Sequence, residues 1–462
     1  MSKMTHLRVF EQINFLRNRP ATAFSDLLDP KCVEEVFRAE GVRYRDRVFS
    51  PYVTLWTFLT QVLSLDHCCR AAVARLIAYR TACGQKPCSA DTGAYCKARQ
   101  RLALNAITRL VRSTASELDQ RAPSKWLWKG REVLLVDGAT LSMPDTAANQ
   151  SAFPQSKSQA PGLGFPFARI VALISFATGT MRDLAIGPCK GKETGETALL
   201  RDLLTRLQGR EILLGDRYFA SYFGIALLAQ RGVDGLFRMH QLRKYDFRRG
   251  VRLGICDHVV NWVKPQRPVW MSRELYDRLP ETLLIRELRV SVHEPGFRID
   301  ELVLVTTLLD PLAYSKDELG QLYFERWNVE LDLRSIKCVM RMDVLRCETP
   351  EMVAKEIWVH ALAYNLIRGV MAAAAEAHDT EPRRISFTGT LQTISAFRDM
   401  LNLTRPETQE TLIKTMLEAI ASHKVGNRPG RVEPRAIKRR PKQHALLREP
   451  RQKARNRLLQ SA

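Results

Sequence analysis

The sequence predicts a mixed α/β protein whose strand-containing core lies between two helical regions and is interrupted by a β-rich insertion. Apolar residues recur at helical spacing in residues 1–125 and again after Pro311. From Arg131 onward, short apolar runs of strand formers come before and between helical patterns, an order typical of mixed α/β folds. The 462 residues, 45% of them hydrophobic, are enough for roughly two to four domains.

The N-terminal segment, residues 1–125, is predicted to be helical. An apolar stripe on one helix face is formed by Ile107, Leu110, Val111 and Leu118. Upstream, residues 89–92 offer caps for a helix that carries Lys97, Arg99 and Arg101. Because Lys97 and Arg101 are four residues apart, they share a face. That face indicates either a helix that enters a nucleic-acid groove or an ordinary solvated basic surface.

The predicted core begins near Arg131, where the helical pattern of apolar residues gives way to short runs of strand formers. Its apolar segments predict buried strands at residues 133–136, 170–174, 181–187 and 212–215. A helix fits residues 193–207, where leucines recur at helical spacing. The first of these strands ends in Asp137 and the last in Asp216, so two carboxylates are expected at strand ends.

Residues from about 236 to 301 differ from the core. Alternating apolar stretches, several Pro and Gly residues and dispersed Arg and Lys indicate a β-rich insertion. A core strand resumes at residues 302–307, and Pro311 ends it.

The segment after Pro311 is predicted to be one long helix. Ser315 and Asp317 can cap it, and it is expected to continue through about Met340. Further helices are expected at residues 350–375 and about 388–422. The chain is therefore divided into residues 1–125, 126–375, 376–423 and 424–462.

The charge of the chain favours a polyanionic partner. The net charge of +22 attracts nucleic acid and would release its counterions on binding. Residues 424–462 hold 13 Lys and Arg, among them Arg439 and Arg440, against Glu433 and Glu449, a net +11. Their Pro- and Arg-rich composition predicts disorder without a partner. This tail could contact phosphate, or it could be a solubilising extension or a targeting signal.

Membrane and secretory proteins are disfavoured. The most apolar segment, residues 361–375, is broken by Asn365 and Arg368, so it does not predict a membrane span. The first 20 residues mix charged and apolar side chains and lack the pattern of a secretory signal. Ten scattered cysteines indicate reduced thiols in a cytosolic protein. Zinc is disfavoured, because no CxxC or HxxxH pair is present.

One helix face after Pro311 carries a carboxylate between cations. At about 100° per residue, an arc of roughly 60° contains four side chains, those of Tyr323, Arg326, Glu330 and Lys337. The nearby acids Glu325 and Asp332 fall on the opposite side of the same wheel. Glu330 is therefore the acid of this helix that we expect in a site.

Asp137 and Asp216 occupy positions where an unpaired carboxylate is costly. A buried ion destabilises the fold by several kcal/mol unless it is paired or bound to a metal. Each Asp alone is more often a turn former, but together with Glu330 they could converge at the strand ends of the sheet. Carboxylate oxygens suit Mg²⁺ or Mn²⁺, and a pair of such ions supports in-line displacement at phosphorus. Arg326 and Lys337 then fit as donors to phosphate.

These residues resemble a known family. The spacing Tyr323-x2-Arg326-x3-Glu330-x6-Lys337 matches the Tyr-Arg-Glu-Lys signature of the IS4 family of insertion-sequence transposases, relatives of the Tn5 transposase. The similarity covers roughly residues 50–375. It extends to four further stretches: Asp137-Gly138-Ala139-Thr140-Leu141, Pro144-Asp145-Thr146 with Asn149 and Phe153, Leu214-Gly215-Asp216, and residues 92–102.

The resemblance implies an RNase H-like catalytic domain at residues 126–375, interrupted between the second Asp and the Glu by the insertion at about 236–301. It implies metal binding and catalysis by Asp137, Asp216 and Glu330, with two Mg²⁺ or Mn²⁺ ions per site. It implies phosphate binding by Tyr323, Arg326 and Lys337, and a helical N-terminal DNA-binding domain.

The resemblance also implies how the protein works on DNA. The expected partners are double-stranded DNA, as terminal inverted repeats and target, and a second copy in a synaptic homodimer. Possible further DNA contacts are Lys97, Arg99, Arg101, Arg439 and Arg440. We expect a cytoplasmic, nucleoid-associated prokaryotic protein that moves an element by cleavage and strand transfer. The alternatives are a catalytically silent DNA-binding protein derived from a transposase, and an RNase H-like nuclease.

Overall fold

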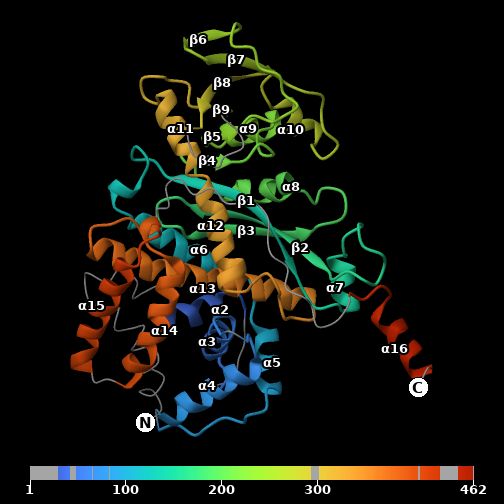
Figure 1. Ribbon diagram of the computed structural model, residues 1–462, viewed down its shortest axis with the longest axis vertical. Helices are drawn as coiled ribbons and strands as arrows, with labels where there is room; N and C mark the ends of the chain where they lie inside the picture. Colours follow the sequence, from blue (N-terminus) through green and yellow to red (C-terminus); the bar gives the residue numbers. More distant parts are fainter. Residues whose placement is uncertain are drawn as a thin grey trace.

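A single nine-stranded sheet runs through the molecule (Figure 1). The computed structural model describes residues 30–41, 48–64, 66–82, 84–292, 301–403, 406–426 and 446–460. Within them the strand order is β3-β2-β1-β4-β5-β9-β8-β7-β6. The strands are β1 (Val133–Ser142), β2 (Phe167–Ser175), β3 (Met181–Pro188), β4 (Ile212–Gly215), β5 (Asp234–Arg238), β6 (Val251–Gly254), β7 (Asp257–Val263), β8 (Thr282–Ser291) and β9 (Glu301–Thr306).

The first five strands form one half of the sheet. Strand β2 pairs antiparallel with both β3 and β1. Strand β4 pairs parallel with both β1 and β5. Three antiparallel strands followed by two parallel ones, in the order 3-2-1-4-5, is the arrangement of an RNase H-like core. The predicted fold class, a mixed α/β core of this kind with helical regions on both sides, is confirmed.

The insertion extends this sheet instead of folding apart from it. Strand β9 pairs with β5, and β8, β7 and β6 follow outward, each antiparallel to its neighbour. A short helix, α10 (Arg273–Asp277), lies between β7 and β8. Figure 1 shows these strands at the top of the molecule, away from the N-terminal helices.

Helices cover both faces of the core sheet. On one face, α8 (Glu196–Leu203) packs on β2 and β3, and α9 (Tyr222–Ala229) packs on β5. The opposite face packs against α6 (Leu104–Gln120) and α13 (Pro350–Ala377). Because side chains alternate along a strand, Leu135 faces the α13 side while Leu134 and Val136 face α8 and α9.

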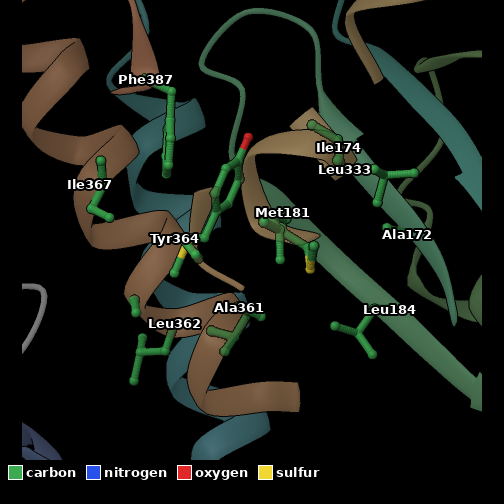
Figure 2. Close-up of a cluster of buried hydrophobic side chains, with 14 of the residues drawn as sticks. Ala172, Ile174, Met181, Leu184, Leu333, Ala361, Leu362, Tyr364, Ile367 and Phe387 are labelled. Atoms are coloured by element: carbon green, nitrogen blue, oxygen red, sulfur yellow. The ribbon is translucent and has the colours of Figure 1, made fainter. Parts of the chain in front are cut away.

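Helix α13 is the centre of the larger hydrophobic core. Figure 2 shows Tyr364 of this helix beside Phe387, close to the strand residues Ile174 and Met181. Helices α3 (Pro51–Val62), α7 (Ala147–Ala152), α14 (Phe387–Leu403) and α15 (Pro406–Ser422) contact α13, and the N-terminal region adds α2 (Pro30–Ala39), α4 (Cys69–Ala82) and α5 (Gly93–Arg101). By length and composition α13 could cross a membrane, but 89% of its most apolar window is buried inside the protein, as in a core helix.

Several predicted boundaries are wrong. The helix expected at residues 193–207 is α8 followed by a 3-10 turn at Leu204–Arg206, and the helix expected at about 388–422 is α14 and α15. The tail expected to be disordered contains helix α16 (Arg451–Gln460), which is rich in helix formers and joined to Glu449 by an ion pair from Arg457 at 2.9 Å. Arg439 and Arg440 lie outside the described residues.

Candidate active site

Asp137 and Asp216 lie at matching positions on neighbouring parallel strands. Leu135 of β1 pairs with Leu214 of β4; Asp137 is two residues further along β1, and Asp216 is two residues after Leu214, directly past the end of β4. Both carboxylates therefore point to the same face of the sheet, the face that packs against α13. Each accepts a hydrogen bond from a backbone N–H just after it, Asp137 from Gly138 at 2.7 Å and Asp216 from Tyr218 at 2.8 Å.

The prediction that Asp137 ends its strand is wrong. Strand β1 continues to Ser142, because residues 138–142 keep pairing with β2 after the pairing with β4 has stopped at Leu135. Asp137 thus lies in the strand beside the point where β4 ends. The carboxylate is held by regular strand geometry, which fixes its direction more firmly than a loop would.

Burial sets the charge of Asp137. Its side chain is only 21% exposed, and burial raises its pKa to about 6. The Gly138 N–H and the Arg326 guanidinium oppose this rise, while the carboxylates of Glu196 and Asp216 add to it. Asp137 is therefore a carboxylate in a site that lacks enough positive charge.

Glu330 reaches the same place from a helix that differs from the predicted one. The single helix expected from Ser315 to about Met340 is two helices, α11 (Lys316–Phe324) and α12 (Trp327–Arg334), followed by a π-helical turn at Ser335–Val339. The start was predicted correctly, since Ser315 and Glu318 form a capping box.

The break between α11 and α12 has a physical cause. Helix α11 packs on β5 and β8, whereas α12 packs on β1. A twisted sheet turns between these strands, so one straight helix could not follow both. The chain tightens at the break, where the Arg326 N–H donates to the Tyr323 carbonyl three residues back at 3.0 Å.

Arg326 links Glu330 to Asp137. Its Nη2 lies 2.8 Å from Oε1 of Glu330, and its Nη1 lies 3.9 Å from Oδ2 of Asp137. Burial lowers the pKa of Arg326, but the Tyr323, Glu330 and Asp137 groups outweigh burial and raise it. Tyr323 is buried beside this guanidinium, and burial raises the pKa of its phenol. Three of the four signature side chains are thus gathered at Asp137.

No hydrogen bond or ion pair joins Lys337 to this cluster in the part of the chain that the structure describes. It lies in the π-helical turn, where the 100° spacing used to place it no longer applies. Among the described residues its ammonium group makes no hydrogen bond or ion pair. The other two acids of the segment are occupied elsewhere, because Glu325 contacts Asn328 on the surface and Asp332 is fully buried against Arg368 and Arg383.

The basic residues of α5 divide into two groups. Lys97 and Arg101 are exposed, and Thr92 precedes the helix without a side-chain cap. Arg99 is instead buried, with its guanidinium donating to Gln61 at 3.1 Å. Arg99 therefore does not share the surface that Lys97 and Arg101 present.

Two charged residues at the site were not predicted. Glu196 begins α8, and its carboxylate occupies the space beside Gly138, where a Cβ would lie 2.4 Å from Oε1. Burial and Asp216 raise the pKa of Glu196, against the effect of Arg169. Arg238 ends β5, and burial together with Arg217 and Arg326 lowers its pKa. The apolar run before Arg238, like those before the two Asp residues, was the available signal; nothing in the sequence marks Glu196.

The donor set of this site suits a hard divalent cation. Asp137, Asp216 and Glu330 provide carboxylate oxygens, the ligands that Mg²⁺ and Mn²⁺ prefer. In the part of the chain that the structure describes, no three His, Cys, Asp or Glu side chains are close enough to form a metal site as they stand. The guanidinium of Arg326 lies between Asp137 and Glu330 and supplies the positive charge there.

Comparison with known proteins gives consistent matches. Residues 128–366 match the family model described as the transposase DDE domain. The chain is 28% identical over 444 residues to the transposase InsG for insertion sequence element IS4 of Escherichia coli (strain K12), covering 94% of this chain and 96% of InsG. Among solved structures, it is similar to the piggyBac transposase in a synaptic complex with hairpin DNA, at 9% identity, with a TM-score of 0.42 and 86% of each chain covered.

Proposed function

The chain belongs to the DDE transposases of the IS4 family, and from this premise we propose that it cuts and rejoins DNA with Asp137, Asp216 and Glu330 as its catalytic acids. The register of β1 and β4 is the observation that carries the assignment. It puts two carboxylates on one face of the sheet, and Arg326 joins the first of them to Glu330.

The proposed site needs metal ions. DDE transposases generally use divalent metal ions, and Asp137, Asp216 and Glu330 would hold two Mg²⁺ or Mn²⁺ ions here. When bound, such a pair activates the attacking oxygen and stabilises the leaving oxygen of an in-line displacement. The raised pKa of Asp137 supports this proposal, since a cation in the site would favour the charged carboxylate.

The chain's own cations would hold the DNA strand. Arg326 is proposed to act twice. Before metal binds it neutralises Asp137 and Glu330, and afterwards it donates a hydrogen bond to a phosphate oxygen. Tyr323 supports the position of Arg326 from its buried site. Lys337, whose ammonium group makes no hydrogen bond or ion pair among the described residues, is proposed as a further phosphate donor.

Recognition of the element ends is proposed to involve surfaces outside the catalytic core. Lys97 and Arg101 are exposed on α5, and the tail that includes Arg439 and Arg440 carries a net +11. We propose terminal inverted repeats and target DNA as partners, a homodimer in the synaptic complex, and a location at the bacterial nucleoid in the cytoplasm.

Replacement of one acid tests the assignment. We expect Glu330→Gln to abolish Mg²⁺-dependent nicking at the element ends while binding of those ends stays close to wild type. The matched control is Glu325→Gln, five residues earlier on an exposed position, which should nick normally. Nicking by Glu330→Gln at the parental rate would remove Glu330 from the site.

Strand joining separates the transposase from the two alternatives. With Mg²⁺, cleaved element ends and a target plasmid, we expect joined products from 3′-OH attack. A nuclease would stop after cleavage, and a silent DNA-binding protein would not cleave. Retention of Asp137, Asp216, Glu330 and Arg326 favours activity, because binding alone requires only a basic surface.

A further inference from the structure

Three neighbouring parallel strands present charged side chains at one level of the sheet. The paired leucines at this level are Leu135 of β1, Leu214 of β4 and Leu236 of β5. Two residues beyond them lie Asp137, Asp216 and Arg238. Because side chains alternate between the two faces of a sheet, residues two positions apart share a face. The three leucines belong to the hydrophobic core on the α13 side, so the three charged residues are directed to that side as well. Arg238 therefore stands in line with the two catalytic acids.

Arg238 is half-buried but has no partner for its charge. Within the described residues its guanidinium makes no hydrogen bond and no ion pair, although Asp216 is its neighbour in the row. The other side chains that face it are the cations Arg217 and Arg326 and the buried phenol of Tyr323. Arg217 donates to Gln241 at 2.9 Å, and Arg326 is engaged with Glu330.

This environment is unfavourable for a purely structural arginine. Partial burial disfavours the charged guanidinium of Arg238, and the two neighbouring cations Arg217 and Arg326 add repulsion. A structural arginine normally satisfies its donors, as Arg286 does with Asp257 at 2.6 and 2.8 Å. A half-buried arginine with no protein partner for its charge among the described residues, at the edge of a proposed phosphodiester site, points to an anion that arrives with the substrate.

We propose that Arg238 binds the non-bridging oxygens of a DNA phosphate at or next to the cleaved phosphodiester. This inference rests on the proposed function of the Asp137, Asp216 and Glu330 site. A guanidinium presents paired N–H donors that match two phosphate oxygens, so the contact orients the strand as well as attracting it. In this arrangement the phosphate lies between the acids of β1 and β4 and the cation of β5.

Phosphate neutralisation provides a direct test. Duplexes carrying the terminal repeat, read from the DNA that flanks the gene, are prepared with one neutral methylphosphonate at each successive position around the cleavage point. Binding is measured in EDTA, so that no metal is present and no cleavage occurs. For the wild type we expect one position at which the methylphosphonate weakens binding by roughly ten- to a hundredfold, the range of a charged hydrogen-bonded contact.

In Arg238→Gln we expect binding of the unmodified duplex to fall by a similar factor and the methylphosphonate penalty at that position to disappear. Arg238→Lys should give an intermediate penalty, since it keeps the charge and loses the paired donors. The control Arg273→Gln changes an 81% exposed arginine on α10 and should retain the whole wild-type pattern. Equal melting temperatures would show that Arg238→Gln is folded.

Two outcomes would overturn the proposal: an unchanged penalty at every position in Arg238→Gln, or no sensitive position near the cleavage point in the wild type. Failure of the proposed function looks different. In that case the wild type would not nick the unmodified duplex with Mg²⁺, whatever the methylphosphonate pattern in EDTA.

Discussion

Asp332, two residues after Glu330, is fully buried and forms an ion pair with Arg368 of α13. The oxygen paired with Arg368, Oδ1, also accepts a hydrogen bond from the Tyr364 hydroxyl at 3.0 Å, and the other oxygen, Oδ2, faces Arg383. Helix α12 is thereby fastened to the helical core through one acid, while its neighbouring acid Glu330 stays 37% exposed at the candidate site.

Asp332→Asn is expected to destabilise the protein strongly. It would leave two buried guanidinium groups without their counter-ion, a loss of about 3–5 kcal/mol in the free energy of unfolding. Denaturant titration in the absence of metal measures this. Glu330→Gln, two residues away, is the matched comparison and should change stability by less than about 1 kcal/mol. Similar stability of the two variants would contradict the structural role of Asp332.

Asp137→Asn is expected to stabilise the metal-free protein at neutral pH. Burial raises the pKa of Asp137 to about 6 from the 3.8 of an ordinary aspartate, so the folded state holds its proton more tightly than the unfolded state. This contribution to stability is complete below the unfolded pKa and is lost as the pH rises through about 6.

At pH 7.5 in EDTA the ionised Asp137 therefore opposes folding, and Asn should raise the free energy of unfolding by on the order of 2 kcal/mol. The difference should shrink as the pH falls from 6 toward 4. Melting curves across this pH range provide the measurement. A difference that stays constant with pH would mean that the Asp137 pKa is not raised.

Gly138→Ala is expected to disturb the site through Glu196. The new Cβ would lie 2.4 Å from Oε1 and 2.7 Å from Cγ of Glu196, so that side chain must move. We expect a loss of about 1–2 kcal/mol, typical of overpacking. Glu196→Ala removes the side chain that the new Cβ would meet. In the Glu196→Ala background, Gly138→Ala should therefore lower the free energy of unfolding much less than it does in the wild type. Additive effects of the two changes would show that Glu196 does not occupy this space.

Removal of residues 424–462 is expected to reduce the salt dependence of DNA binding. The deletion removes a net +11, so fewer counterions should be released when DNA binds. The slope of log affinity against log salt concentration, measured on one duplex, should become shallower. An unchanged slope would show that the tail does not contact phosphate.

The site was predictable where a local pattern carries the information. Apolar runs of strand formers followed by Asp137 and Asp216, and a signature spacing around Glu330, are visible in the chain itself. The predicted helix after Pro311 was right at its capped start, because a capping box is a local interaction between Ser315 and Glu318.

The rest depended on contacts between distant residues. Whether α11 and α12 are one helix depends on which strands they pack against, and the π-helical turn at Lys337 departs from the regular spacing used to place that residue. Arg99 shows the same limit. Its burial beside Gln61 comes from the packing of α3 on α5, which helical spacing alone does not reveal.

By itself the sequence determined the order of strands and helices, the presence of a β-rich insertion and the three acids, because propensity, periodicity and motif spacing are local properties of the chain. Only the tertiary structure decided that Asp137, Asp216 and Arg238 form one row and that Arg326 joins Glu330 to Asp137. The physical reason is that strand register and helix docking are set by pairing and packing between segments far apart in the sequence, and these fix the direction of each side chain.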